Sequence, residues 1–322
     1  MRRAVNEARR LMVARGGKDF VPSAARQRPR SGLKRPQQSV PLPISDTDAP
    51  LQWADYVLHE QIGAGGMGRV YRATRKLDGK EFAIKFLRKA WVHRESALQR
   101  FLAEARTVAA LSHRGIVPVH GVGKTPGGSL FLLMDCVLGS DLQRIRDERS
   151  ISVKQAVCWI AAAAEIVQFA HDNGVIHCDL KPSNLLVDAA NQIQVSDFGF
   201  AVRLEEANLA SLLAGTPAFM APEQIDSCWG EISPRTDIWG LGSVLYFLLY
   251  GRPRHDGGDV PSTLARAVAR QPVLFPKKGE VLIPVSVCEI LERCLNKDLD
   301  QRFESASSLA NALNHASDSL QG

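Results

Sequence analysis

The 322-residue sequence lacks several features that mark particular classes of protein. Its six cysteines are scattered, and no two of them form a C-x-x-C pair. This spacing argues against a zinc knuckle and a disulfide framework, and it favours reduced thiols in the cytoplasm. The longest apolar runs, near 156–170 and 238–250, are interrupted or too short for a bilayer core of roughly 30 Å. We therefore expect a cytoplasmic protein with no membrane span.

The net charge of +6 is uneven, and most of the chain has no excess of basic residues. Residues 1–50 hold eleven Lys and Arg against four Asp and Glu, which leaves 29 basic and 30 acidic residues in 51–322. Because the excess belongs to one segment, we expect no specific nucleic-acid binding by the rest of the chain.

Residues 1–50 are poor in bulky apolar side chains and rich in Arg, Pro, Ser and Gln. This composition cannot offset the entropy of ordering the chain, so it predicts a basic, disordered arm. The Arg-rich first fifteen residues also resemble an organellar transit peptide, although Glu7 and the lack of a serine-rich stretch oppose that interpretation. Binding of an acidic partner or a polyanion by the arm is a third interpretation.

From residue 51 onward the pattern changes from strands to helices. Alternating and β-branched runs come first, interrupted by a helical pattern at 96–112, and helical patterns dominate after residue 137. We expect an α+β fold of two lobes, a small, mainly β N-lobe of five strands and one helix (about 56–136) and a large, mainly α C-lobe (about 137–316), in a domain of 51–316 before a tail at 317–322. The predicted strands are 56–63, 68–75, 80–87, 115–123 and 129–136, and the predicted C-lobe helices are 152–172, 234–251, 262–270, 285–297 and 305–316.

The stretch "GAGGMGRV", residues 63–70, lies between two predicted strands. Gly63, Gly65 and Gly68 have no side chains, so backbone amides there can approach phosphate oxygens closely, while Val70 would lie over a base. A Rossmann turn is disfavoured, because it needs a helix directly after the glycines. A glycine-rich hairpin without a ligand is the alternative.

Lys85 stands in the otherwise apolar run "FAIKFL". Taken alone, such a lysine is typical of an edge strand, from which its amine reaches water. Glu104 follows nineteen positions later on the helical pattern of 96–112. An ion pair between the two would point the lysine at phosphates, and burying that pair is costly unless it has such a use.

The stretch "HCDLKPSN", residues 177–184, gathers chemically useful side chains. Asp179 can orient an acceptor hydroxyl and accept its proton, and Lys181 can neutralise a transferred phosphate. Asn184 and Asp197, thirteen positions further on in "SDFG", offer the hard oxygen ligands that Mg²⁺ prefers. Each residue alone would be a solvated loop charge, but together and in this order they predict phosphoryl transfer.

These motifs resemble the signature set of protein kinases over about residues 56–316. The resemblance implies ATP-dependent phosphorylation of serine or threonine on protein substrates, with ATP and Mg²⁺ as cofactors and Mn²⁺ as a substitute for the metal. The wording "GAGGMGRVY", "DLKPSN" and "GTPAFMAPE" is most similar to serine/threonine kinases, including the bacterial Hanks-type group. Asp237 resembles the aspartate that braces the catalytic loop, and Arg302 resembles the usual partner of Glu223 in "APE".

The resemblance also implies roles for individual residues. Asp179, Lys181, Asn184 and Thr216 match catalytic positions, and Asn184 and Asp197 match metal ligands. In the implied ATP site, Met134 borders the back of the adenine pocket, Asp135 to Val137 form the hinge, and three apolar side chains sandwich the base. The implied ATP-binding residues are Ile62, Gly63, Ala64, Gly65, Gly66, Met67, Gly68, Val70, Ala83, Lys85, Glu104, Met134, Asp135, Val137 and Leu186.

Cys178 is the departure from the family pattern. Most relatives place an arginine before the catalytic aspartate, where it binds a phosphate added to the activation loop. In this chain the segment before "GTPAFMAPE" has Ser211 as its only hydroxyl, so we interpret the phosphate switch as absent. The alternative is that Cys178 only fills space while another basic residue, such as Arg203, takes over phosphate binding.

Two rival functions fit a protein of this kind. A pseudokinase, which binds without catalysis, is disfavoured because Lys85, Asp179, Asn184 and Asp197 are all present. A small-molecule kinase of related fold is disfavoured by "GTPAFMAPE", the segment that holds a protein substrate. The sequence predicts neither the particular substrates nor the regulator nor the oligomeric state.

Overall fold

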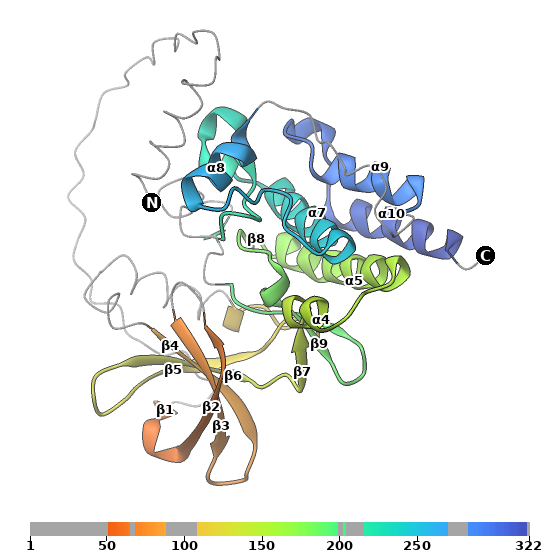
Figure 1. Cartoon of the computed structure of the whole chain (residues 1–322). Helices are drawn as coiled ribbons and strands as arrows, with labels where there is room; N and C mark the ends of the chain where they lie inside the picture. The colour runs from red at the N-terminus through yellow and green to blue at the C-terminus, as the bar shows by residue number, and fades with distance from the viewer. Residues whose placement is uncertain are drawn as a thin grey trace, which may run out of the picture.

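The structure is a computed structural model that divides into a β lobe and a helical lobe (Figure 1). The predicted basic arm, residues 65–67 of the glycine-rich stretch and most of the predicted helix 96–112 lie outside the described residues. The described residues are 51–64, 68–87, 108–198, 202–203, 216–269 and 283–320.

The N-lobe is built on one sheet in the strand order β1-β5-β6-β4-β3-β2. The sequence predicts five strands, and the sixth is β1, two residues long and parallel to β5. Two residues are too few for an alternating pattern to be visible. The strands are β1 (Leu51–Gln52), β2 (Tyr56–Ala64), β3 (Gly68–Arg75), β4 (Glu81–Leu87), β5 (Val119–Lys124) and β6 (Leu130–Asp135).

The strand predicted at 115–123 begins later than expected, at Val119. Pro118 precedes it and has no amide hydrogen to donate to a neighbouring strand. Before it, Ile116 forms an isolated bridge with Val195, so this segment contacts the C-lobe instead of the sheet. Only the last part of the predicted helix 96–112 is described, and residues 108 and 109 are helical.

Alternation along β4 and β6 divides the buried side chains of the sheet between two clusters. Ile84 packs with Leu133 and aromatic rings in one cluster, while Ala83 packs with Leu132 and Met134 in the other. Fully burying a side chain of the size of Leu or Ile stabilises a fold by about 1.5–3 kcal/mol. The second cluster also includes side chains from the C-lobe, and it therefore joins the two lobes.

The C-lobe is helical, with small strands at the junction with the N-lobe (Figure 1). Both ends of each of its five predicted helices lie within three residues of the prediction. The helix predicted to end at 297 ends at Cys294, and the last one continues to Ser319, beyond the predicted end at 316. The helices are α4 (Leu142–Glu148), α5 (Val153–Asp172), α6 (Pro222–Ile225), α7 (Pro234–Tyr250), α8 (Val260–Val268), α9 (Val285–Cys294) and α10 (Ala306–Ser319).

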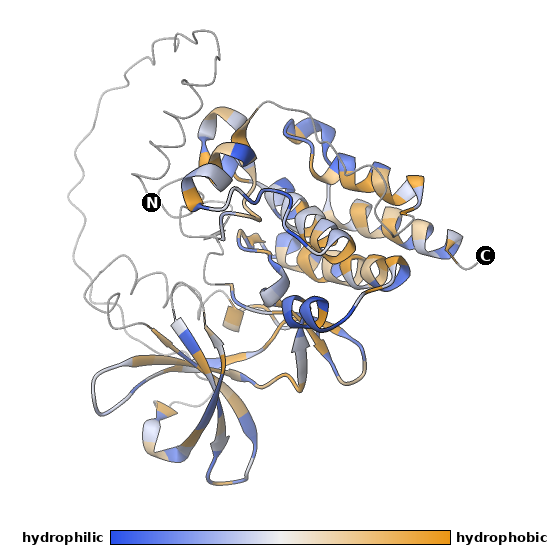
Figure 2. Ribbon diagram, viewed as in Figure 1, coloured by the Kyte–Doolittle hydropathy of each residue, from blue (hydrophilic) through white to orange (hydrophobic). Residues whose placement is uncertain are grey.

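Helix α5 forms the centre of the C-lobe. The hydroxyl of Ser152 accepts a hydrogen bond from the Gln155 amide and begins the helix, and eleven of its side chains are buried. Figure 2 shows the contrast between the largely hydrophobic α5 and the hydrophilic α4. Among the described residues, one helix, α5, is long and apolar enough to cross a membrane, judged by length and composition alone. Of its most apolar 18-residue stretch, 56% is buried inside the protein.

Short strands and 3-10 turns hold the segment between α5 and α6. The strand β9 lies between β7 and β10, and β8 pairs with β11. A 3-10 turn at Pro182–Asn184 connects β8 to β9. The remaining strands are β7 (Gly139–Asp141), β8 (Val175–Ile176), β9 (Leu185–Asp188), β10 (Ile193–Val195) and β11 (Val202–Arg203).

A fully buried ion pair links α6 to the segment before α10. Arg302 donates two hydrogen bonds to the carboxylate of Glu223, at 2.7 and 2.9 Å, and both side chains have no exposed surface. The guanidinium also donates to the carbonyls of Asn296 and Arg235, and it lies 5.0 Å from the ring of Trp239. The pairing expected from the sequence is therefore present.

We predict that Arg302→Met lowers the free energy of unfolding by about 3–5 kcal/mol, because it leaves the Glu223 carboxylate buried without its partner. Urea denaturation of the two proteins measures this loss. Arg144→Met removes the exposed pair with Glu148 and should cost less than about 1 kcal/mol. Equal losses in the two variants would contradict the assignment of a buried, structural ion pair.

His255 is buried, and its ring stacks on Trp239 with the centroids 5.8 Å apart. Burial lowers the pKa of His255 to about 3, and the charges of Arg254, Lys297 and Arg266 act in the same direction. The unfolded chain therefore binds a proton near pH 6.5 that the folded chain does not bind. This contribution to stability is complete above pH 6.5 and is lost as the pH falls toward 3.

We predict that wild-type protein loses about 2–3 kcal/mol more of its unfolding free energy than His255→Phe does between pH 7 and pH 4.5. Urea denaturation at the two pH values gives the difference. His315→Phe, which replaces an exposed histidine on α10, serves as the control and should follow the wild-type curve. Parallel curves for wild type and His255→Phe would show that His255 is protonated in the folded protein.

Candidate active site

The carboxylate of Asp237, in the first turn of α7, binds the loop that follows β8. Asp237 accepts hydrogen bonds from the backbone N–H groups of His177 and Cys178, at 2.8 and 2.9 Å, and contacts Nε2 of His171 at 2.8 Å. Burial disfavours its charged form, but the hydrogen bond and charge of His171 and the backbone donor together lower the pKa of Asp237. The bracing role expected for Asp237 matches this geometry.

Cys178 lies in the left-handed backbone region, with φ of 63°. Its side chain is buried, and burial together with neighbouring carboxylates raises the pKa of the thiol well above its usual value. Its carbonyl oxygen accepts a hydrogen bond from Nε2 of Gln224 at 2.7 Å. Cys178 is therefore a neutral residue in a strained conformation, held by backbone contacts on both sides.

Asp179 forms hydrogen bonds with three other residues that are predicted to be catalytic. Its Oδ2 accepts from Nζ of Lys181 at 2.6 Å, and its Oδ1 accepts from the backbone N–H of Thr216 at 3.2 Å. Asn184 donates from Nδ2 to the Asp179 carbonyl at 2.8 Å. Burial raises the pKa of Asp179, Lys181 lowers it, and the nearby Asp197 raises it, so the net shift is upward. Such a carboxylate accepts a proton more readily than an exposed one.

Asp197 faces the N-lobe, where its Oδ1 accepts a hydrogen bond from Nζ of Lys85 at 2.6 Å. Burial disfavours the charged form, but the charges of Lys85 and Lys181 outweigh it and hold the pKa of Asp197 well below its usual range. Asp197 also has a positive φ, of 63°. Glu104, predicted to pair with Lys85, lies outside the described residues.

Asn184 and Asp197 fit the ligand set of a magnesium ion that shares its coordination with phosphates. The amide nitrogen of Asn184 is bonded to Asp179, which leaves its amide oxygen for a cation. In the part of the chain that the structure describes, no group of three or more His, Cys, Asp or Glu side chains could hold a metal by itself. Two oxygen-bearing side chains with phosphates and water are the usual Mg²⁺ arrangement.

An apolar cluster at the junction of the lobes contains the residues predicted to surround the adenine. Ala83 and Met134 belong to its buried part, and Val70, Val137 and Leu186 are partly buried and pack against it. Asp135 ends β6 beside this cluster and contacts His120 and Lys80. The structure therefore brings these predicted residues together from β3, β4, β6 and β9.

The glycine-rich stretch is described in part. Ile62, Gly63 and Ala64 end β2, and Gly68 begins β3. A Cβ on Gly68 would lie 2.3 Å from the carbonyl oxygen of Phe86, so the pairing of β3 with β4 already requires glycine there. Gly65, Gly66 and Met67 lie outside the described residues.

Sequence reasoning missed two histidines and a glutamine that support the loop. His177 contacts the Ser196 carbonyl through Nε2 at 3.1 Å and packs on Phe198, with ring centroids 4.5 Å apart. His171 contacts Asp237, and Gln224 contacts the Cys178 carbonyl. The sequence signals were His171, in an otherwise apolar predicted helix, and His177, two residues before Asp179. Gln224 had no such signal.

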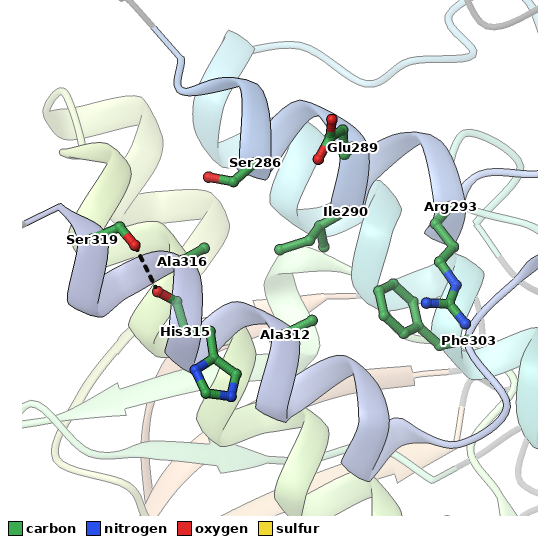
Figure 3. Close-up of a pocket in the computed structure, with 9 residues that line it drawn as sticks. All are labelled: Ser286, Glu289, Ile290, Arg293, Phe303, Ala312, His315, Ala316 and Ser319. Carbon is green, nitrogen blue, oxygen red and sulfur yellow. Dashed lines mark hydrogen bonds between the residues drawn. The ribbon is translucent and has the colours of Figure 1, made fainter.

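One hollow in the described structure lies away from this site. It has a volume of about 370 Å³ and lies between α9 and α10, where none of the predicted catalytic or ATP-binding residues lines it (Figure 3). We therefore locate the candidate active site from the chemistry of its side chains and not from the volume of a hollow. The residues lining it are Ser286, Glu289, Ile290, Arg293, Phe303, Ala312, His315, Ala316 and Ser319.

The fold, the bracing aspartate and the paired lysine and aspartate across the lobes define a protein kinase architecture. The chain matches the protein kinase domain family over residues 56–316 and belongs to that family.

Named bacterial relatives are similar over most of this chain. It is 31% identical over 265 residues to the serine/threonine-protein kinase PknA of Mycobacterium tuberculosis, an alignment covering 80% of this chain and 60% of PknA. It is 32% identical over 262 residues to PknB of the same organism, covering 79% of this chain and 41% of PknB. A probable serine/threonine-protein kinase of Clostridium acetobutylicum is 28% identical over 263 residues, which is 81% of this chain and 39% of that protein. The alignments therefore leave 40–61% of these relatives unmatched.

Proposed function

We propose that this chain transfers the γ-phosphate of Mg-ATP to serine or threonine on protein substrates. The observation that carries the proposal is the joint attachment of Lys181 and Thr216 to the carboxylate of Asp179. This arrangement places a proton acceptor, a cation and a substrate-side backbone segment within hydrogen-bond reach of one another. Serine/threonine kinases among the relatives support the choice of acceptor.

In this mechanism, Asp179 orients the acceptor hydroxyl and takes its proton. Each oxygen of the carboxylate has two lone pairs, so the bonds from Lys181 and Thr216 leave capacity for the substrate. Lys181 lies close enough to Asp179 to balance the charge of the transferred phosphate. Catalysis then depends on positioning and on charge neutralisation.

ATP would lie between the lobes, with its base against the apolar cluster of Val70, Ala83, Met134 and Leu186. Lys85 would contact the phosphates while Asp197 holds its amine in place. Mg²⁺ would be held by Asn184 and Asp197 together with phosphate oxygens and would neutralise the phosphate charge, and Mn²⁺ could replace it.

Contacts among the catalytic residues favour an enzyme over a pseudokinase. These residues form two hydrogen-bonded pairs, Lys85 with Asp197 and Asn184 with Asp179. A binding scaffold has no need of a carboxylate whose pKa is raised beside a lysine. We also propose a cytoplasmic protein without specific nucleic-acid binding, on the composition of residues 51–322.

We predict that Asp179→Asn lowers kcat by 10²–10⁴-fold, because general-base positioning by a side chain contributes about that much. Transfer of labelled phosphate from ATP to generic protein substrates measures the loss. Lys85→Met should also abolish most transfer, while Asp147→Asn on exposed α4 should not change it. Near wild-type turnover in Asp179→Asn would contradict the base assignment, and mainly phosphotyrosine in the product would contradict the choice of serine and threonine.

The neutral Cys178 supports the proposal that activity does not depend on activation-loop phosphate. An arginine at this position would carry an unpaired charge until a phosphate arrived, whereas the pKa of Cys178 is raised by burial and the thiol stays neutral. Ser211 lies outside the described residues. The backbone of Arg203 pairs with Val175 in β11 and β8, so this alternative phosphate-binding residue is close to the loop in the fold.

We predict that Ser211→Ala, and separately phosphatase treatment, leave kinase activity within a few-fold of the untreated wild type. The assay is the same phosphate transfer, with the phosphorylation state of the enzyme checked by mass spectrometry. A ten-fold or larger loss in Ser211→Ala that an acidic substitution restores would support a phosphate switch instead, with Arg203→Ala as the variant that tests its receptor.

A further inference from the structure

Gln224 connects the catalytic loop to helix α6 through both ends of its side-chain amide. Its Nε2 donates to the carbonyl oxygen of Cys178 at 2.7 Å, and its Oε1 accepts from the backbone N–H of Ala221 at 3.0 Å. The side chain is 3% exposed. A buried amide bonded at both ends to backbone of two segments fixes their separation as well as satisfying its own polar atoms.

The first end of this link lies on the peptide unit that leads into Asp179. The N–H of that unit belongs to Asp179 and donates to Nδ1 of His177 at 3.2 Å, while its carbonyl belongs to Cys178. Cys178 is in the left-handed region, which is unfavourable for a residue with a side chain. The tilt of this peptide unit, and with it the direction of Asp179, therefore depends on the donor that holds the Cys178 carbonyl.

The second end lies on the segment that carries Thr216. Ala221 is the N-cap of α6, five residues after Thr216, whose backbone N–H donates to Oδ1 of Asp179 at 3.2 Å. The same two segments are thus joined twice, once at the carboxylate of Asp179 and once through Gln224. If the second connection is lost, the first has to hold the separation alone.

We propose that Gln224 is a positioning residue for phosphoryl transfer, which sets the catalytic aspartate at the correct distance from the segment that holds the protein substrate. The inference rests on the proposed kinase function. It also goes beyond that function, because it names an uncharged connection between the two segments that needs no phosphate.

Gln224→Met tests the connection with little change of volume. Methionine has a similar length but forms neither hydrogen bond, and the neighbouring cavity, about 10 Å³ in volume, leaves little space for more than one replacement water. We expect kcat for a peptide substrate to fall about ten-fold, with KM for ATP within two-fold of wild type. The hydrogen bonds of Gln224 involve neither the apolar cluster proposed to hold the base nor the pair of Lys85 and Asp197.

Gln224→Glu separates donation from acceptance. It keeps an acceptor for the Ala221 amide, but only a protonated carboxyl can donate to the Cys178 carbonyl. The carboxylates of Asp179, Glu223 and Asp237 act on this neighbourhood and disfavour a further negative charge. We therefore expect its kcat, relative to wild type, to be higher at pH 6 than at pH 8, a trend that a general loss of stability does not produce.

Gln168→Met is the matched control. Gln168 also joins two elements through both ends of its amide, accepting from the Ser307 amide at 3.0 Å and donating to Asp172 at 2.8 Å, but it links α5 to α10. Both Met variants are compared by melting temperature, kinetics, and hydrogen exchange of the amides of residues 177–181. Faster exchange at 177–181 is expected in Gln224→Met and not in Gln168→Met.

Two results would overturn the inference. One is an active wild type with kcat for Gln224→Met within two-fold of it, and the other is equal exchange at 177–181 in wild type and Gln224→Met. If neither wild type nor Gln168→Met transfers phosphate, the proposed kinase function fails. The exchange measurement still decides whether Gln224 holds the loop, because it needs no activity.

Discussion

The carboxylate of Asp237 is the constraint on which the active site depends. It lies in the first turn of α7, where the partial positive charge of a helix N-terminus favours an anion. Its side chain is almost fully buried, and that cost is offset by donors from His177, Cys178 and His171. One charge therefore joins the last turn of α5, the loop after β8 and the start of α7.

Asp237 accepts from the backbone N–H groups of His177 and Cys178, and other groups of the loop connect it to the rest of the site. The ring of His177 packs between the Ser196 carbonyl and Phe198, and this contact ties the catalytic loop to the segment that carries Asp197. Cys178 and Asp197 both have φ near 63°. Strained conformations of this kind persist only where surrounding contacts determine them, and here those contacts orient the carboxylates of Asp179 and Asp197, which are predicted to be functional.

Long periodic elements were predictable from the sequence, and short ones were not. The periodicity of α5 and α7 placed both helices within about one residue of their observed ends, because apolar residues recur on the face that packs in the core. Strands of two or three residues, such as β1, β8 and β11, have no period to detect. They are recognised only from their pairing, β1 with β5 and β8 with β11.

The residues of the candidate site were likewise predictable from the sequence only in part. Asp179, Lys181 and Asn184 are close in sequence, so the local spacing predicted their proximity. The family resemblance supplied the long-range partners, Asp237 for the loop and Glu223 for Arg302. Gln224 was missed because a glutamine after a proline and a glutamate has no distinctive pattern, and its hydrogen bond to the Cys178 carbonyl joins residues 46 positions apart in the chain.

The four buried or partly buried carboxylates of the C-lobe site each have a basic partner of their own. Three of the partners are lysine or arginine, and the fourth is histidine. Each pairing is intramolecular and is made at 2.6–2.8 Å. The pairs are Asp179 with Lys181, Asp197 with Lys85, Asp237 with His171, and Glu223 with Arg302.

This charge balance gives a physical reason for the neutral residue at 178. Asp179, Glu223 and Asp237 all act on the Cys178 side chain, and each raises the pKa of its thiol. A guanidinium placed there would add a positive charge beside carboxylates that already have partners, and it would have no partner of its own. With cysteine the existing pairs are undisturbed, and the loop is held by amides, an imidazole and carboxylates within the chain. These contacts are the physical basis of the proposal that activity needs no added phosphate.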